Sequence, residues 1–297
     1  MAEPTPPVPL PAGRLVALPD RGPVFVREAS GPPGAPTVVL LHGWTATADL
    51  NWLLSYGPLS DHFHVLAMDH RGHGRGIRSR RPFRLEDCAD DVAALALATG
   101  TSRLIAIGYS MGGPIAQLLW RRHPDLVAGL VLCATARTFA GNGPADRLFV
   151  ASLFGLSVAA SLTPGPIRRQ VTDSFLRRRV EQSRNQEWVL AQLRRNDPAA
   201  VLQAGIALRA FNSKPWAGEI DVPTAVVVTT RDQVVHPRRQ LALAEAIPGA
   251  TVYPVDGDHG ACVDVPRRFV PALLAAAGDV ATRSAAGRSS GALPEPV

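Results

Sequence analysis

The sequence predicts an α/β fold with a mostly parallel, eight-stranded sheet, helices on both faces and an inserted helical cap. Three observations support this. Short apolar, β-branched runs alternate with helix-like stretches from residue 37 onward, as in βαβ units. The alternation stops at residue 137 and resumes near residue 220. The chain of 297 residues, 46% of them apolar, is long enough for one large core with such an insertion.

The expected strands and core helices follow in chain order. A hairpin opens the fold, with antiparallel strands at residues 14–18 and 23–28 joined by a Pro-Asp-Arg-Gly turn. The other six strands are expected at residues 37–41, 63–68, 103–107, 129–134, 223–229 and 250–255. Core helices are expected at residues 49–55, 85–99, 113–122 and 237–247.

The chain is expected to divide into a core, a cap and two tails. The core takes residues 14–136 and 220–278, and the helical cap takes residues 137–219. Prolines separate the expected cap helices, which fall at residues 146–161, 166–183, 186–195 and 198–211. A proline-rich arm, residues 1–13, and a Ser/Gly/Pro/Ala-rich tail, residues 279–297, are expected to be disordered.

Composition limits the compartment and the class of partner. The sequence shows no signal peptide and no long apolar stretch, so we expect no transmembrane segment. Cys88, Cys133 and Cys262 suggest neither a disulfide framework nor a zinc site, which favours a reduced, cytoplasmic protein. The net charge of +6 comes from the arginine-rich cap, but this segment lacks a nucleic-acid-binding motif and interleaved aromatics. We therefore expect no nucleic acid as partner.

A cluster of histidines and one aspartate raises the question of a metal. His62, His64, Asp69, His70 and His73 lie within twelve residues. Their spacing departs from the H-x-H-x-D-H pattern of binuclear metallohydrolases. In addition, His62 and His64 share one face of an expected strand, while the others lie beyond its end. No metal site is therefore expected.

The most specific motif is Gly108-Tyr109-Ser110-Met111-Gly112, a G-x-S-x-G pattern between an expected strand and an expected helix. In this context the motif predicts a nucleophile elbow, a strained turn that exposes the serine Oγ. The Met111 backbone N–H, at a helix N-terminus, would then face a developing oxyanion. The structural alternative is a Gly/Ser-rich loop that only joins the strand to the helix.

A base and an orienting acid are expected further along the chain. Asp232 follows the strand at 223–229, and His259 lies in a glycine-flanked loop after the strand at 250–255. Both sit at strand ends, where α/β sheets gather their chemistry. In chain order Ser110, Asp232 and His259 form a candidate triad, with His259 as base. Taken singly, Asp232 could be a helix cap and His259 a surface histidine.

The second oxyanion donor is expected in the loop after the strand at 37–41. That loop reads His42-Gly43-Trp44, and the glycine lets the backbone turn toward Ser110. The backbone N–H of Trp44 is the expected donor. We interpret His42 as a loop organiser, because His259 already fills the role of base.

Taken together, the motifs resemble the serine α/β-hydrolase superfamily, in its compact esterase form with a separate cap. The matching motifs span most of residues 14–276 and are His42–Trp44, Asp69–Gly74, Gly108–Gly113, Arg231–Val235 and Gly257–Gly260. The resemblance implies a central sheet and a Ser–His–Asp triad at the positions named above. One departure is that Arg75-Gly76 follow Gly74, where the pattern commonly continues with x-Ser.

The expected function is a serine hydrolase that cleaves a carboxylic ester through an acyl-enzyme intermediate, without a cofactor. The same triad also serves hydrolases of C–C bonds or amides and acyltransferases, so these remain alternatives. A non-catalytic small-molecule binder is a further one. A serine at position 110 argues against dehalogenase and epoxide hydrolase chemistry, which needs a carboxylate nucleophile. The sequence does not indicate an oligomeric state.

The substrate is expected to be a small ester, acyl or lipid-like in character. An apolar run in the first cap helix suggests that Phe149, Leu153 and Phe154 line an acyl pocket. Arg168 or Arg169 could attract an anionic head group or a lipid surface. The alternative is that the apolar run only packs the cap onto the core.

Overall fold

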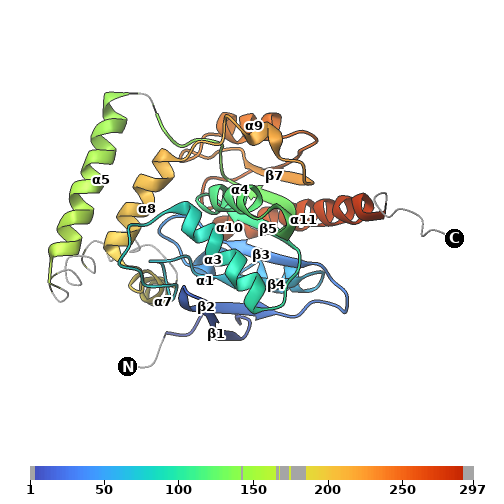
Figure 1. Cartoon of the computed structure of the whole chain (residues 1–297), viewed down its shortest axis with the longest axis horizontal. Helices are drawn as coiled ribbons and strands as arrows, with labels where there is room; N and C mark the ends of the chain where they lie inside the picture. Colours follow the sequence, from blue (N-terminus) through green and yellow to red (C-terminus); the bar gives the residue numbers. More distant parts are fainter. Residues whose placement is uncertain (1–3, 142, 165–166, 168–173, 175–184, 290–297) are drawn as a thin grey trace.

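One mixed sheet forms the centre of the computed structural model, which describes residues 4–289 except 142, 165–166, 168–173 and 175–184 (Figure 1). Its eight strands are β1 (Gly13–Leu18), β2 (Gly22–Ala29), β3 (Thr37–Leu41), β4 (His64–Met68), β5 (Leu104–Tyr109), β6 (Val127–Cys133), β7 (Thr224–Thr229) and β8 (Thr251–Val255). They lie in the order β1-β2-β4-β3-β5-β6-β7-β8. Only β1–β2 and β2–β4 pair antiparallel; the other neighbours are parallel. The expected fold class is confirmed.

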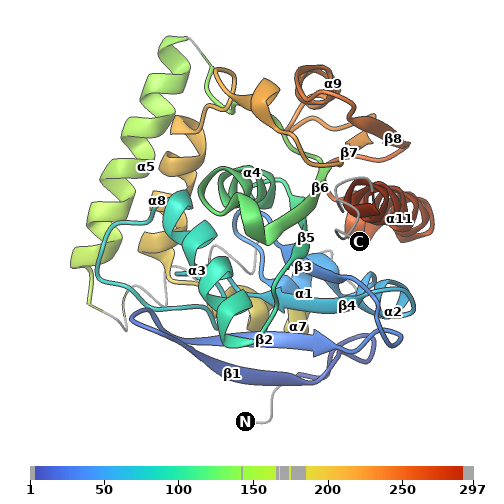
Figure 2. The same ribbon diagram turned by 45° about the vertical axis from the view of Figure 1, so that its right-hand side comes forward.

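Helices cover both faces of the sheet, as Figure 2 shows for α3 and α4 on one side and α11 on the other. One layer consists of α3 (Leu85–Ala98), α4 (Gly112–Arg122) and α9 (Pro237–Ala246). The other consists of α1 (Ala48–Trp52), α2 (Tyr56–Ser60), α10 (Ala261–Asp264) and α11 (Pro266–Ser289). Short 3₁₀ turns lie at Pro124–Leu126 and Ala217–Glu219.

Side-chain alternation along the strands feeds two hydrophobic clusters, one on each face. In β3, Val39 and Leu41 belong to the cluster under α3 and α4, while Val38 and Leu40 belong to the cluster under α11. Successive side chains of a strand point to opposite faces. A strand buried on both faces is therefore continuously apolar, which is the pattern of residues 37–41.

Three described helices lie between β6 and β7, within the expected cap. They are α5 (Pro144–Leu162), α7 (Gln186–Leu193) and α8 (Pro198–Ala210). Helix α5 lies along α8, with α8 between it and the sheet (Figures 1 and 2). The expected helix over residues 166–183 falls almost entirely outside the described residues.

Helix α8 is hydrogen-bonded directly to loops of the core. The Trp44 indole donates from Nε1 to the carbonyl oxygen of Val201 at 2.7 Å. Asn196, just before the helix, donates from Nδ2 to the carbonyl oxygen of Thr45 at 2.8 Å. The indole also lies close against the helix, because a Cβ added at Gly205 would be 2.6 Å from a Trp44 ring carbon. The start and the middle of α8 are therefore held by the loop after β3.

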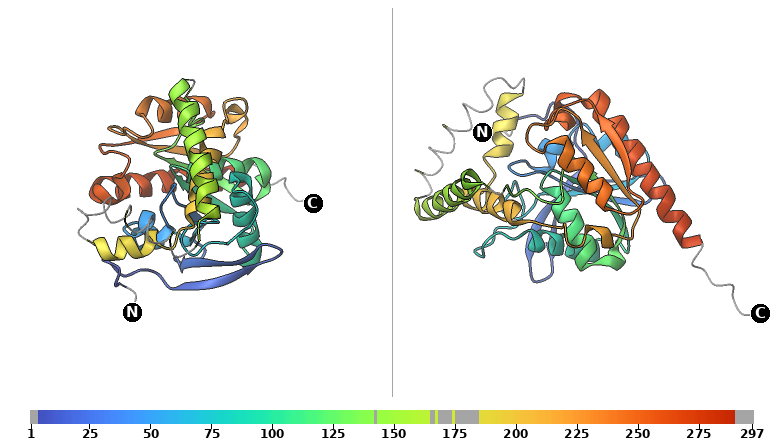
Figure 3. Two further views of the ribbon diagram at one scale, coloured as in Figure 1. Left: turned by 90° about the vertical axis from the view of Figure 1, so that its left-hand side faces the viewer. Right: turned by 90° about the horizontal axis from the view of Figure 1, so that it is seen from above.

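The C-terminal segment differs from the expectation. The disordered tail predicted from residue 279 is wrong for residues 279–289, which continue helix α11 (Figure 3). Val280 is fully buried, and Arg283 donates to the Thr224 carbonyl oxygen at 2.9 Å while pairing with Asp279. Ser284 donates to the Ala128 carbonyl oxygen at 2.6 Å. These contacts with β6 and β7 stabilise a sequence whose composition resembles a linker.

Two smaller differences concern the first part of the chain. The helix expected at residues 49–55 is shorter, because α1 ends at Trp52, and a second short helix, α2, follows at Tyr56–Ser60. The arm expected to be disordered, residues 1–13, is bound to the core at its C-terminal end. There Arg27 donates to the carbonyl oxygen of Pro11 at 2.9 Å, and Gly13 already belongs to β1.

The described chain shows neither a bilayer-spanning helix nor a disulfide. None of the described helices combines the length and the apolar character that crossing a membrane requires. Cys88, Cys133 and Cys262 are all buried and unpaired.

Candidate active site

The turn between β5 and α4 places Ser110 in a strained conformation. Ser110 has a φ of 51°, in the left-handed region that side chains other than glycine rarely adopt. Its N–H donates to the Cys133 carbonyl oxygen at 2.9 Å, and its own carbonyl oxygen accepts from the Thr135 hydroxyl at 2.7 Å. A Cβ at Gly108 would overlap the Gly112 carbonyl oxygen, so the tight turn requires glycine there. These features are those of a nucleophile elbow.

Three side chains from three loops form a continuous hydrogen-bond chain at the carboxyl ends of the strands. Ser110 Oγ lies 3.0 Å from His259 Nε2. His259 Nδ1 lies 2.7 Å from Asp232 Oδ2. Ser110 is 7% exposed and Asp232 is fully buried. The structure therefore brings together the three residues that the sequence motifs single out.

Asp232 is held as a carboxylate by several donors. Its Oδ1 accepts from the backbone N–H groups of Val234 and Val235 at 2.8 and 2.7 Å. Its Oδ2 accepts from the Thr229 hydroxyl at 2.8 Å and from Gln240 Nε2 at 3.2 Å, besides its contact with His259. Burial alone would raise the pKa of Asp232, but the hydrogen bond and charge of His259, with the other donors, lower it.

Two further side chains, Asp258 and Tyr109, position the loop that carries His259, and no sequence motif indicates these roles. Asp258 Oδ1 accepts from the backbone N–H groups of Gln233 and His259 at 3.0 and 2.7 Å, so it joins the Asp232 loop to the His259 loop. The Tyr109 hydroxyl donates to the His259 carbonyl oxygen at 2.6 Å. Asp256 instead pairs with Arg231 and Arg268 on the surface.

The loop after β3 approaches the nucleophile closely. A Cβ at Gly43 would lie 3.3 Å from the Ser110 Cβ, so glycine permits the approach. The Gly43 N–H donates to Asn51 Oδ1 at 2.9 Å, and Asn51 Nδ2 lies 3.4 Å from Cys262 Sγ. Asn51 thus ties this loop to the segment after His259. In the described residues, no hydrogen bond engages the backbone N–H of Trp44 or of Met111.

His42 lies in a buried group of three histidines whose rings are tilted relative to one another. Its Nδ1 is 2.8 Å from the Gly43 carbonyl oxygen, and its Nε2 accepts from the His70 backbone N–H at 2.9 Å. The rings of His70 and His73 lie 4.2 and 5.4 Å from the His42 ring. Burial lowers the pKa of His42 to about 4, so the ring is neutral at pH 7. It organises the loop, as interpreted from the sequence.

His64 and Asp69, two of the other residues in the histidine-rich stretch, each contact a different part of the core. His64 Nε2 lies 3.3 Å from Glu28. Asp69 accepts from the backbone N–H groups of Ala48 and Arg75, both at 2.8 Å. Across the described chain, no group of three or more His, Cys, Asp or Glu side chains is arranged to hold a metal ion.

Of the three residues expected to line an acyl pocket, the structure describes the side chains of two, and these two differ in exposure. Leu153 is 6% exposed, and a Cβ at Gly205 of α8 would be 3.0 Å from its Cδ1. Phe154, the next residue, is 62% exposed. Phe149 belongs to helix α5, but its side chain is not among the described parts of the structure. Arg168 and Arg169 lie outside the described residues altogether.

Comparisons with known proteins point to one family. A family model described as the alpha/beta hydrolase fold matches residues 36–266. A protein of Agrobacterium fabrum, whose name assigns it to carbamate hydrolysis, is 31% identical over 252 residues, 81% of this chain and 92% of that relative. The pimeloyl acyl-carrier-protein methyl ester esterase of Sodalis glossinidius is 36% identical over 106 residues, 36% of this chain and 39% of that esterase. The enol-lactonase of Burkholderia xenovorans LB400 superposes with a TM-score of 0.73 at 25% identity, covering 89% of this chain and 100% of that one.

Proposed function

This chain belongs to the α/β hydrolase fold family, and we propose that it is a serine hydrolase that cleaves a small carboxylic ester. The observation that carries the proposal is the hydrogen-bond chain from Ser110 through His259 to Asp232, with distances of 3.0 and 2.7 Å. The strained backbone of Ser110 and the burial of Asp232 add to it. An activated serine needs this arrangement of nucleophile, base and orienting acid.

In the acylation step, Ser110 Oγ forms a bond to the ester carbonyl carbon while its proton passes to His259 Nε2. The carbonyl oxygen becomes an oxyanion, which the backbone N–H groups of Trp44 and Met111 would stabilise, each by about 3 kcal/mol. When the tetrahedral intermediate collapses, the C–O bond to the alcohol breaks. His259 then gives its proton to the departing alkoxide, which leaves as an alcohol. Asp232 keeps the tautomer of His259 that allows both transfers.

In the deacylation step, water replaces the alcohol. His259 Nε2 takes a proton from the water, whose oxygen attacks the acyl carbon. Collapse of the second intermediate breaks the bond to Ser110 Oγ, and the proton on His259 returns to that oxygen. The carboxylic acid leaves, and no cofactor is consumed. Every proton in the cycle moves through His259, which contacts both Ser110 and Asp232.

A carbamate or an amide is the second candidate substrate, because the relative from Agrobacterium fabrum covers most of this chain. The same steps apply, except that His259 must protonate a departing nitrogen. A panel of matched ester, carbamate and amide substrates would separate the two activities. Faster turnover of carbamates than of esters, compared as kcat/KM, would replace the ester proposal with the carbamate one.

We further propose that the inserted segment 137–219 acts as a cap over this site. Helix α8 supports this, since it is hydrogen-bonded to the loop that carries the proposed oxyanion donor Trp44. Leu153 packs near the same glycine of α8 as the Trp44 indole, which would give the substrate an apolar wall. A small-molecule acyl ester fits such a wall better than a charged acyl group does.

The central test is replacement of the nucleophile. Ser110→Ala should lower kcat for p-nitrophenyl acetate by at least about 10,000-fold, because removal of a triad member leaves only binding and oxyanion stabilisation. Asp232→Asn should have a similar effect. The matched control is Ser60→Ala, at a serine whose hydroxyl only bonds the Gly57 carbonyl oxygen. A fluorophosphonate probe should label the wild type and the control but not Ser110→Ala. Full activity of Ser110→Ala would refute the proposal.

A further inference from the structure

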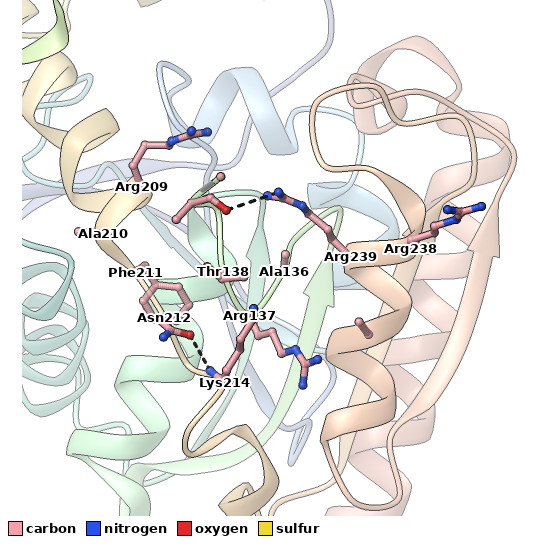
Figure 4. A pocket seen from close by; sticks show the side chains of 13 residues that line it. Ala136, Arg137, Thr138, Arg209, Ala210, Phe211, Asn212, Lys214, Arg238 and Arg239 are labelled. Atoms are coloured by element: carbon pink, nitrogen blue, oxygen red, sulfur yellow. Dashed lines mark hydrogen bonds between the residues drawn. The ribbon is translucent and has the colours of Figure 1, made fainter. Parts of the chain in front are cut away.

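A cavity of about 630 Å³ lies between the inserted segment and helix α9, outside the Ser110–His259–Asp232 chain. Three segments line it, as Figure 4 shows. They are the loop after β6 (within residues 136–141), the end of α8 with the residues that follow (within 209–214), and the first half of α9 (within 238–242). None of the three candidate triad residues lines the cavity.

The lining is strongly basic. Its cationic side chains come from all three segments and are Arg137, Arg209, Lys214, Arg238 and Arg239, while the described lining contains no aspartate or glutamate. Two arginines elsewhere in the core, Arg27 and Arg71, instead pair with buried carboxylates. Among the described residues, no carboxylate forms a salt bridge with Arg137, Lys214, Arg238 or Arg239. Four of the five cations that line the cavity therefore have no carboxylate partner in the described part of the chain.

Two of these cations, Arg209 and Arg239, repel each other in the empty cavity. Burial and the neighbouring charge of Arg239 lower the pKa of Arg209, which lies across the cavity (Figure 4). Helix α9 begins at Pro237, so Arg238 and Arg239 add positive charge to the positive end of the helix dipole. Cations are normally favoured at the opposite end of a helix. A bound anion would relieve both forms of repulsion.

We propose that this cavity binds the phosphate or pyrophosphate group of a small organic molecule. Guanidinium groups match the oxygens of phosphate in paired hydrogen bonds, and several cations together suit a multiply charged anion. The volume is in the range of small-molecule sites. Apolar lining residues, among them Ala136, Ala140 and Ala242, leave room for an uncharged part of the ligand.

The cavity and the triad are separate but share two structural elements. The loop after β6 begins beside Thr135, whose hydroxyl donates to the Ser110 carbonyl oxygen at 2.7 Å. Helix α9 carries Gln240, which donates to Asp232 at 3.2 Å and to the Val235 carbonyl oxygen at 2.7 Å. A ligand in the cavity would touch the elements that support the triad without touching the triad. The proposal does not depend on the reaction at Ser110.

Calorimetric titration with inorganic pyrophosphate tests the proposal, at about 150 mM salt so that long-range attraction is screened. The full chain should bind pyrophosphate and should not bind acetate at the same concentrations. The double substitution Arg238→Gln/Arg239→Gln should weaken pyrophosphate binding by about tenfold or more. Lys214→Gln, on a different wall, should also weaken it. All three side chains are exposed, so the variants should fold normally.

The matched control is Arg80→Gln/Arg81→Gln, which removes two consecutive exposed arginines that do not line the cavity. It changes the net charge by the same amount as the α9 double variant and should bind pyrophosphate like the wild type. The proposal is overturned if pyrophosphate does not bind. It is also overturned if the control weakens binding as much as the cavity variants do, since the attraction would then come from net charge alone.

Discussion

Acidification from pH 7 to pH 5 should destabilise this protein through its buried histidines. His42, His70 and His73 are fully buried next to the loop that approaches Ser110. Burial lowers the pKa of His42 to about 4, and burial together with the charge of His42 lowers that of His73 to about 3. Burial also places the pKa of His70 well below its usual value of 6.5. The folded protein therefore keeps the rings of His42 and His73 neutral at pH 5.

The sign of the effect follows from where the proton binds first. A histidine with a lowered folded pKa is protonated in the unfolded chain before it is protonated in the fold. Its contribution to stability is complete above pH 6.5, the unfolded pKa, and is lost as the pH falls toward the folded pKa. At pH 5 the loss per residue is about 2 kcal/mol, from 1.5 pH units at 1.36 kcal/mol each. His42 and His73 together should cost about 4 kcal/mol, a large share of a typical domain stability.

Urea unfolding at steps between pH 7 and pH 5 measures this loss, and one substitution isolates it. His73→Asn removes a titrating ring but keeps an N–H to donate to the Arg71 carbonyl oxygen, which lies 3.1 Å from His73 Nδ1. The variant should lose about 2 kcal/mol less than the wild type over this range. His62→Asn, at an exposed histidine, is the matched control. If His73→Asn and the wild type lose equal stability, the histidine cluster is not the source.

Two further predictions concern stability and can be measured by thermal unfolding. Gly112→Ala should be strongly destabilising, because the added Cβ would overlap the Leu41 carbonyl oxygen. Gly155→Ala should instead stabilise helix α5 by about 0.5–1 kcal/mol, because no atom lies within 4 Å of the added Cβ. Equal effects of the two substitutions on stability would contradict these contacts. Truncation after Gly278 should lower the free energy of unfolding by about 3 kcal/mol or more, because it removes the fully buried Val280 and the contacts beyond it. A truncation at the end of helix α11 is the control. Equal stability of the two truncated proteins would show that this part of the helix is dispensable.

The strands and the triad candidates were predictable because their signals are local. A strand buried on both faces reads as an unbroken apolar run, and residues 104–109 and 224–229 show this pattern directly. Ser110 and Asp232 each follow such a run, and His259 follows the edge strand β8, whose residues alternate in burial. The carboxyl ends of parallel strands meet at one edge of a sheet, so the order of the motifs implies their proximity.

The supporting side chains were not predictable because their roles depend on contacts distant in the sequence. Asn51 bonds to Gly43 nearby but also reaches Cys262. Tyr109 stands inside the most specific motif, yet its bond to the His259 carbonyl oxygen crosses 150 positions. Gln240 reads as an ordinary polar residue of a helix, and only the fold buries it against Asp232.

Helix α11 was not among the expected helices, and its residues after 278 were expected to be disordered, for a related reason. Alanine, serine, threonine and glycine after residue 278 give no clear apolar stripe, and their composition matches that of linkers. The helix is held by tertiary contacts instead, including the donation from Ser284 to the Ala128 carbonyl oxygen. Local composition could not reveal that this part of the helix would pack against β6 and β7.

The attachment of α8 to the core has a consequence for chimeric proteins. The helix is fixed by Trp44 at Val201 and by Asn196 at Thr45, and Gly205 leaves space for the indole ring. The inserted segment is therefore not an interchangeable module with a boundary at residues 137 and 219. If this segment were replaced by that of a relative, the hydrogen bonds of residues 44–45 with the segment would be lost, unless those two residues were replaced together with the helix. Recombination libraries for this chain should keep the loop after β3 and α8 in one block.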